Sequence, residues 1–517
     1  MSQGNPQVVK VGIGPLSVED VVAVARFGAA VELEPEALEE IRQTRARVEE
    51  LAQESTPVYG ISTGFGALAR KFIPADLRAQ LQLSLVRSHA AGSGAEVETE
   101  VVRALMLLRL STLCTGRTGV RPVVAQTYAA VLNARIHPVV HEYGSLGCSG
   151  DLAPLAHCAL ALLGEGRVRV DGGQVCQADE ALSAAGIDPL VLEEKEGLAL
   201  INGTDGMLGM LCLAIADLRQ VAKVADITTA MTLEGLQGSL QVFADDLQQL
   251  RPHPGQALAA ANVRAVAHGS SILDAGAENF KKTQVQDAYS VRCAPQVAGG
   301  FRDTIEHASA VAERELAAAV DNPVIALDGR VSSNGNFHGA PVAYALDFLA
   351  IVCADLASIS ERRSDRFLDV ARNRGLNAFL AQDTGVDSGL MIAQYTQASI
   401  VSELKRLAAP ASVDSIPSSA MQEDHVSMGW NAARKLRKSV DGVQRVLAIE
   451  ALTAARAIEM REGDPAPGTG AAVAAMRQIT PGFGPDRFLA PEIESAVQLV
   501  QTGELIDSVE NVVGPLH

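Results

Sequence analysis

Three long stretches without proline restrict the fold of this chain more than any other feature. They cover residues 190–251, 342–409 and 418–464. Proline breaks helix interiors, and apolar residues recur in these stretches at helical spacing. Two such apolar faces are Leu346, Leu349, Cys353, Leu356 and Val440, Val443, Leu447, Leu452. We therefore expect helices of about 30 residues, each about 45 Å long, one of them from about Val426 to Met460.

Composition agrees with helix packing. Of 517 residues 48% are apolar, but only one is tryptophan and six are tyrosine, which favours helices over a β-sandwich. Helices of this length exceed a compact domain, so the prediction is a mainly α fold with an elongated bundle that packs against copies of itself. Frequent glycine and proline before residue 196 predict a smaller mixed N-terminal region. We expect regions 1–196 and 197–517 to form one catalytic unit.

Charge and cysteine content exclude several classes of protein. The formal charge of −18 repels phosphate backbones, so we expect no nucleic-acid partner. Seven cysteines without a C-x-x-C pair argue against a disulfide framework and a zinc knuckle. His137 and His141 are four apart, but Pro138 lies between them, so a helical zinc pair is not expected. Without a signal architecture or an apolar run of about 18 residues, we expect a cytoplasmic protein with no membrane contact.

The densest cluster of unusual residues is Gly144-Ser-Leu-Gly-Cys-Ser-Gly-Asp-Leu-Ala-Pro-Leu-Ala-His157. Its second half predicts the start of a helix, with Asp151 as N-cap and Pro154 in the first turn. Gly164 is expected to end this helix. Ser149 then lies just before a helix N-terminus, where the dipole favours developing negative charge.

Local sequence alone leaves three interpretations of this segment. A serine-hydrolase elbow needs G-x-S-x-G, but Gly147-Cys-Ser-Gly-Asp151 lacks the final glycine. A phosphate loop needs a lysine that is absent here. A plain glycine-rich turn that joins two elements explains the residues as well as any local chemistry does.

The segment 144–157 resembles the signature of the histidine/phenylalanine/tyrosine ammonia-lyase family. In that family an Ala-Ser-Gly tripeptide cyclises and loses water, which gives a 4-methylidene-imidazol-5-one (MIO) ring. The resemblance implies that Cys148, Ser149 and Gly150 form MIO autocatalytically, without an external cofactor. The amide nitrogen of Gly150 would attack the carbonyl of residue 148, which requires a compressed backbone that glycine tolerates. Only the backbone of Cys148 enters the ring, so we expect cyclisation although alanine is commoner there.

The resemblance covers roughly residues 10–510 and implies further site residues. The loop Tyr59-Gly-Ile-Ser-Thr-Gly-Phe-Gly66 resembles the family's tyrosine loop, in which the residue at the Tyr59 position takes part in proton transfer. His89 is at the position that contacts the substrate side chain, and Asn202 is at the position near the substrate amine or carboxylate. Phe337 completes the pocket wall by the same resemblance.

The run Gln286-Asp-Ala-Tyr289-Ser-Val-Arg292 has spacings of three, which predict that its polar side chains share one helical face. The planar fork of Arg292 suits bidentate binding of an α-carboxylate. The resemblance implies that role for Arg292, with Tyr289 as a second catalytic phenol and Gln286 orienting the substrate.

Gln422 and Glu423 resemble the version of this site in family members that act on histidine. Phenylalanine and tyrosine lyases have glutamine at the position of Glu423. A carboxylate suits an imidazole, which can donate an N–H or carry positive charge, but a buried charge facing a phenyl ring is unfavourable. We therefore expect elimination of ammonia from L-histidine to give trans-urocanate, with Tyr59, Tyr289 and Glu423 as candidate bases for the β-proton.

Alternatives remain at this point. A tyrosine ammonia-lyase or an MIO-dependent aminomutase would share the electrophile, and a non-catalytic scaffold would share only the fold. The resemblance further implies a fumarase/aspartase-like bundle in a homotetramer, with active sites shared between subunits.

Overall fold

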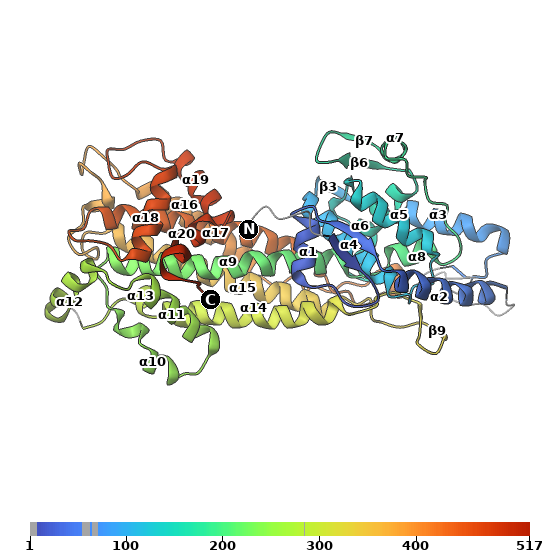
Figure 1. Cartoon of the computed structure of the whole chain (residues 1–517), viewed down its shortest axis with the longest axis horizontal. Helices are drawn as coiled ribbons and strands as arrows, with labels where there is room; N and C mark the ends of the chain where they lie inside the picture. Colours follow the sequence, from blue (N-terminus) through green and yellow to red (C-terminus); the bar gives the residue numbers. More distant parts are fainter. Residues whose placement is uncertain (1–7, 54–62, 65–70, 284) are drawn as a thin grey trace. The chain divides into compact units, whose positions relative to one another are not determined.

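The computed structural model describes residues 8–53, 63–64, 71–283 and 285–517, without the side chains of 278–283. Helices dominate it, and the strands are short (Figure 1). The mainly α class predicted from the sequence is confirmed. The described chain divides into two compact units. Unit 1 contains residues 1–216, 308–347 and 410–434, and unit 2 contains 217–307, 348–409 and 435–517.

Unit 1 combines helices with small sheets. Its helices are α1 (Val18–Ala25), α2 (Pro35–Gln53), η2 (Ala75–Leu77), α3 (Arg78–His89), α4 (Thr99–Cys114), α5 (Pro122–Asn133), α6 (Leu152–Leu162), α7 (Ala178–Ala184), α8 (Glu196–Ile201) and η5 (Ser419–Met421). Its strands are β1 (Val8–Val11), β2 (Ala30–Leu33), β3 (Ser93–Glu96), β4 (Ile136–Pro138), β5 (His141–Tyr143), β6 (Arg167–Val170), β7 (Val175–Gln177), β8 (Val324–Ile325) and β9 (Val331–Ser332). The pair β1–β2 is parallel, whereas β3–β5, β4–β6–β7 and β8–β9 are antiparallel.

Unit 2 is helical in its described part. It contains η3 (Leu240–Phe243), α10 (Asp245–Gln249), α11 (Pro254–Val266), α12 (Ser271–Thr283), α13 (Tyr289–Arg292), η4 (Ala378–Leu380), α16 (Met391–Leu407), α18 (Pro467–Ile479), α19 (Ala490–Gln501) and α20 (Glu504–Val513). The chain passes between the units within four longer helices, which are α9 (Asp205–Gly235), α14 (Ala294–Leu316), α15 (Ala340–Leu368) and α17 (Gly429–Glu459), and once more after α16, between Ala409 and Pro410. The predicted domain boundary near residue 196 rests on composition and stays a prediction.

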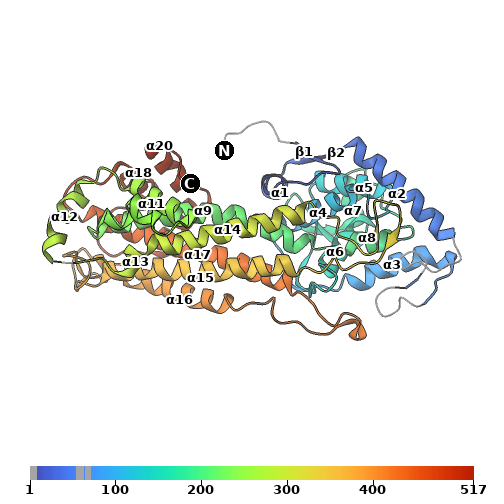
Figure 2. The ribbon, with the colours of Figure 1, turned by 90° about the horizontal axis from the view of Figure 1, so that it is seen from below.

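The long helices match the expectation from the proline-free stretches. Helices α9, α15 and α17 have 31, 29 and 31 residues, and every residue of the two predicted apolar faces is buried. Within unit 2 these three helices lie side by side (Figures 1 and 2). The carboxylate of Glu450 on α17 joins them, since it binds Thr232 of α9 and both Ser360 and Arg363 of α15. Arg363 and Glu450 are fully buried, so the loss of either partner would leave an unpaired buried charge.

Helix α15 is long and apolar enough, by length and composition, to cross a membrane. However, 61% of its most apolar window is buried inside the protein, as in the core helix of a folded domain.

The core of unit 1 is organised around α4. Residues 101–114 of this helix are all buried, and α4 packs against α1 and α5. Although α4 carries Arg103 and Arg109, it is buried all round, as a core helix is. Because Arg109 of α4 also binds the start of α9 through Asp205 at 2.6 Å, this core fixes the chain around residues 202–205, where the site lies.

Candidate active site

The backbone at residues 147–150 is compressed. Gly147 and Gly150 have φ angles of 65° and 77°, in the left-handed region that favours glycine. Bridges join Gly147 and Cys148 to Gly150, and Gly150 to Gly203. A Cβ on Gly150 would lie 2.0 Å from the carbonyl oxygen of Gly203, so no side chain fits there. The positive φ angle and the nearby carbonyl of Gly203 therefore restrict position 150 to glycine.

Asp151 occupies the N-cap position of α6 as predicted, but its side chain does not cap the helix. It accepts hydrogen bonds from Ser145 Oγ and from the backbone N–H of Met207, both at 2.9 Å. Complete burial raises the pKa of Asp151 to about 7. The carboxyl group therefore ties the segment 145–151 to α9. Its oxygens accept from Ser145 and Met207, and not from the free N–H groups in the first turn of α6. The predicted end of α6 is confirmed, since Gly164 follows it with φ +72°.

Asn202 lies at the C-terminal end of α8 and faces Ser149. Its Nδ2 donates a hydrogen bond to the carbonyl oxygen of Ser149 at 3.1 Å. Its Oδ1 is buried and has no hydrogen-bond partner among the described residues. Arg109 holds the backbone of Asn202 through its carbonyl oxygen at 3.1 Å. Within the described chain, the side chain thus presents one acceptor that is open to a ligand or water.

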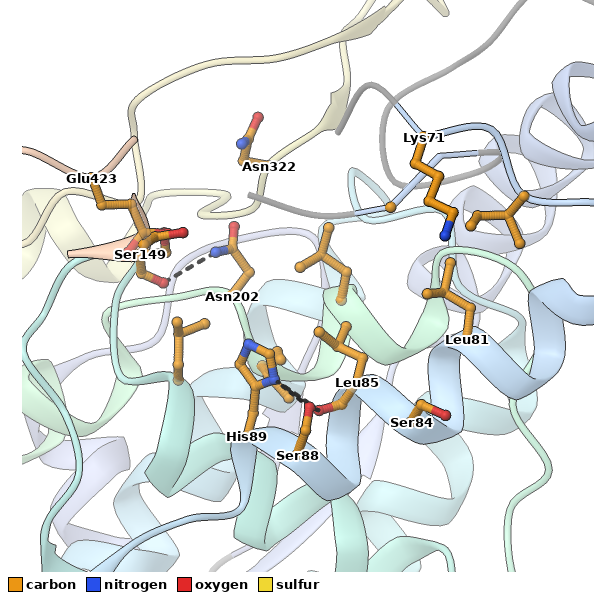
Figure 3. Close-up of a pocket in the computed structure, with 16 residues that line it drawn as sticks. Lys71, Leu81, Ser84, Leu85, Ser88, His89, Ser149, Asn202, Asn322 and Glu423 are labelled. Carbon is orange, nitrogen blue, oxygen red and sulfur yellow. Dashed lines mark hydrogen bonds between the residues drawn. The ribbon is translucent and has the colours of Figure 1, made fainter. Parts of the chain in front are cut away.

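A cavity of about 560 Å³ opens beside Ser149 (Figure 3). Its lining brings together Ser149, Asn202, His89 and Glu423, four residues that the sequence singled out. Ordered apolar neighbours such as Leu85 complete the wall. Its size and mixture of apolar wall and convergent polar groups fit a small-molecule site.

His89 ends helix α3 with a defined ring orientation. Its Nδ1 lies 2.9 Å from the carbonyl oxygen of Leu85 and 3.1 Å from Ser88 Oγ. Because a carbonyl only accepts, Nδ1 carries a proton, and Nε2 is left to face the cavity (Figure 3). His89 therefore offers the cavity an acceptor when the ring is neutral.

Glu423 lies in a loop that packs along the segment 146–148. The N–H of Met428 donates to the carbonyl of Leu146 at 2.9 Å, and Ser427 Oγ donates to that of Gly147 at 3.0 Å. Ser418 Oγ donates to Oε2 of Glu423 at 3.2 Å. Burial, together with the nearby charge of Glu423, raises the pKa of Cys148 to about 12. The thiol of Cys148 thus stays protonated. Glu423 lines the same cavity as Ser149.

Other predicted site residues stand apart from this cavity. Phe337 is half-buried and Gln422 is exposed, and neither lines it. Tyr59 lies outside the described residues.

Gln286, Tyr289 and Arg292 belong to unit 2. The prediction that they share one helical face is wrong, because α13 has only four residues and begins at Tyr289. Asp287 binds the N–H of Ser239 and Arg374, which holds the preceding chain in a non-helical path. The guanidinium of Arg292 lies over the ring of Tyr289, 4.4 Å from its centre, and its Nε has no partner in the described chain.

Sequence reasoning missed Asn322, which lines the cavity between Glu423 and Lys71 (Figure 3). Its Oδ1 accepts hydrogen bonds from Ser333 Oγ and Asn334 N, both at 3.0 Å. The preceding Asp321 is held by Lys195 in a fully buried ion pair. No described residue accepts a hydrogen bond from the side-chain amide nitrogen of Asn322, so this group can donate to a ligand. A polar residue before proline in a turn carries no signal of its own, so only tertiary structure reveals it.

A sequence model of the family described as "aromatic amino acid lyase" matches residues 16–478. The chain belongs to the aromatic amino acid lyase family. It is 62% identical to a histidine ammonia-lyase of Streptomyces coelicolor over 511 residues, which cover 98% of this chain and 99% of that protein.

Solved structures of other aromatic amino acid lyase relatives share the fold. A histidine ammonia-lyase from Trypanosoma cruzi has a TM-score of 0.90 at 37% identity, over 98% of this chain and 96% of that one. A tyrosine aminomutase from Streptomyces globisporus has a TM-score of 0.93 at 36% identity, over 99% and 100%. Structural likeness therefore does not separate lyase from aminomutase, whereas sequence identity favours the histidine ammonia-lyases.

Proposed function

We propose that the chain catalyses the non-oxidative elimination of ammonia from L-histidine to give trans-urocanate, the first step of histidine degradation. The observation that carries this proposal is the position of Glu423. Its carboxylate lines the same cavity as Ser149 and His89, where it can pair with an imidazole ring. The full-length identity of 62% to a histidine ammonia-lyase supports the same conclusion.

The residues at 148–150 fit an MIO cofactor. The carbonyl of Gly203 leaves no room for a side chain at Gly150, and the backbone is already folded back on itself. The proposal is that Cys148, Ser149 and Gly150 close the ring themselves, and that the protonated thiol of Cys148 stays outside the chemistry. The ring would supply an electrophilic methylene, which none of the ordinary side chains provides.

The chain's own residues then have separable tasks. Asn202 holds an N–H donor at the carbonyl oxygen of Ser149, where electron density would gather, and its free Oδ1 suits the substrate amine. His89 and Glu423 contact the imidazole. Gln422 and Phe337 do not line this cavity, and their place as further wall residues rests on the family resemblance alone. Arg292 binds the carboxylate, while Gln286 orients the substrate. Tyr59, Tyr289 or Glu423 removes the β-proton.

The proposed assembly is a homotetramer in the cytoplasm, with active sites shared between subunits. Tyr289 is 70% exposed in the single chain. Several large apolar side chains of unit 2 are exposed as well, which supports a partner subunit that covers them; they are Phe348, Ile351, Ile392 and Tyr395. The proposal includes neither nucleic acid nor membrane as a partner.

The first experiment is intact mass of the purified protein alongside a histidine assay read by urocanate absorbance. We expect a mass two waters below that of the sequence and turnover of histidine. A full-mass chain without turnover would favour a non-catalytic scaffold, and turnover of tyrosine but not histidine would favour a tyrosine lyase or aminomutase.

Glu423→Gln tests the assignment of substrate. Glutamine keeps the shape but loses the charge, so we expect kcat/KM for histidine to fall roughly 10- to 150-fold, as for loss of a hydrogen bond to a charged group. The mass deficit should remain, because Glu423 does not enter the ring. Glu423→Gln with unchanged histidine kinetics would exclude Glu423 as the ring contact.

A further inference from the structure

A second cleft in unit 1 shares no lining residue with the cavity at Ser149. Its volume is about 430 Å³, and it lies where the end of α1, the first turn of α4, the turn after α5 and strand β4 meet. Five charged residues line it, which are Arg26, Glu100, Arg103, Arg135 and Asp171, together with His137. Nothing in the proposed reaction uses these side chains.

Positive charge is in excess in this cleft, although the whole chain carries −18. Arg26 pairs with Glu100 at 2.7 Å, and Arg135 pairs with Asp171 at 2.9 Å. Arg103 has no carboxylate partner in the described part of the chain. The cleft thus contains three guanidinium groups but two carboxylates. Arg103, the guanidinium without a carboxylate, is the most buried of the three, with 5% of the residue exposed.

Backbone carbonyls satisfy only part of Arg103. Its Nε donates to Val24 O at 2.8 Å and its Nη1 to Leu132 O at 3.3 Å, at the last turns of α1 and α5. These oxygens carry partial charge from the helix ends but no formal charge. Burial lowers the pKa of Arg103, and the charge of Arg135 adds to this effect. No described residue binds Nη2, which leaves this edge of the fork for a ligand.

His137 adds a second unmatched donor. Its Nε2 lies 3.1 Å from Nη1 of Arg103 and must accept, because a guanidinium only donates. The proton of the neutral ring is therefore on Nδ1, which is buried without a partner among the described residues. Burial and the charge of Arg103 lower the pKa of His137 to about 4, so the ring remains a neutral N–H donor near pH 7.

We propose that this cleft binds a phosphate group, either inorganic phosphate or the phosphate of a small ester. Donors come from three separate elements, through Arg103 on α4, Arg135 after α5 and His137 on β4. Such a set suits a compact anion with several acceptor oxygens, and arginine is the residue best matched to phosphate. The volume leaves room for more than a free ion, and Thr99 also lines the cleft.

Titration calorimetry of the full-length protein with inorganic phosphate, at constant ionic strength, tests the proposal. We expect saturable binding to the wild type and about tenfold or more weaker binding to Arg135→Ala, as for loss of a charged hydrogen bond. Asp171→Asn should bind several-fold more tightly, because it removes a competitor for Arg135 and a like charge to the anion. Arg103 is left intact, since it also holds α1 and α5.

Arg47→Ala is the matched control, because it removes the same charge from an exposed pair on α2 outside the cleft. It should leave phosphate binding unchanged. Adenosine monophosphate distinguishes the two sources, since tighter binding than phosphate indicates an ester ligand and weaker binding indicates the free ion. No saturable binding to wild type, equal binding by chloride, or equal weakening by Arg47→Ala and Arg135→Ala would overturn the proposal. All readouts are independent of histidine turnover.

Discussion

The segment 144–157 in unit 1 and the segment 285–292 in unit 2 both carry proposed active-site residues, but different forces hold them. Partners from distant segments bind the main chain of the first, both through backbone groups, as for Asp151 N on Gly203 O at 2.7 Å and Met428 N on Leu146 O at 2.9 Å, and through side chains, as for Ser427 Oγ on Gly147 O. Side chains fix the second, because Asp287 binds Arg374 and Ser239, and Arg363 reaches the carbonyl of Ser290. The comparison teaches that the proposed ring closure needs a main chain held in place, whereas the proposed substrate contacts need side chains that point away from their own segment.

Ser149→Ala should have the largest effect. Without the serine hydroxyl no methylidene group can form, so we expect histidine turnover to fall by about a thousandfold or more, as when one member of a catalytic unit is lost. The mass deficit of two waters should disappear with it. Ser183→Ala on α7, an exposed position, is the control and should retain both. Activity retained in Ser149→Ala would mean that the segment 144–157 is a structural turn and forms no catalytic group.

Asn202→Ala should come next. It removes the donor to the carbonyl of Ser149, and the loss of one such donor lowers kcat by about 100- to 1000-fold. Asn202→Asp keeps an acceptor but not the donor, so it should lose a similar factor in kcat. Equal losses in both variants with a normal mass deficit assign the effect to Nδ2, whereas a fully active Asn202→Asp would assign it to Oδ1.

Arg292→Ala tests the segment 285–292. We expect kcat/KM to fall roughly 10- to 150-fold, because a charged hydrogen-bonding partner of the carboxylate is lost. Arg292→Lys should fall less, since it retains the charge but not the fork. Mixing Ser149→Ala chains with Arg292→Ala chains and reassembling them should restore part of the activity. If mixing restores nothing, each active site uses residues of one chain only.

Asp151→Asn should show the smallest effect, in the pH dependence of stability. The pKa of Asp151 is about 7 in the folded protein and 3.8 when unperturbed, because burial disfavours its charged form. The folded state therefore binds the extra proton between these values, and stability falls as pH rises from about 4 to 7. Denaturant melts across this range should show a shallower decline for Asp151→Asn, and parallel slopes would contradict the assigned burial effect.

The sequence predicted regular features better than tertiary ones. The long helices followed from proline-free apolar periodicity, since that pattern has a direct physical cause in helix geometry. Ser149, Asn202, His89 and Glu423 line one cavity, while the roles that the family resemblance implies for them stay predictions. Local patterns failed where distant partners compete. The side chain of Asp151 binds Met207 N and Ser145 Oγ instead of capping α6. Asp287 binds Arg374 and lies outside a helix.

The close approach of Gly150 to Gly203 has a further consequence for how the protein matures. The carbonyl that lies beside Gly150 belongs to the junction of α8 and α9, which is distant in sequence. An unfolded chain cannot hold that carbonyl in place, so the contact between Gly150 and Gly203 forms only after this junction has docked. In the proposed chemistry, the loss of two waters would then serve as a permanent record that an individual molecule has reached its native packing. Mass spectrometry during refolding could count such molecules directly.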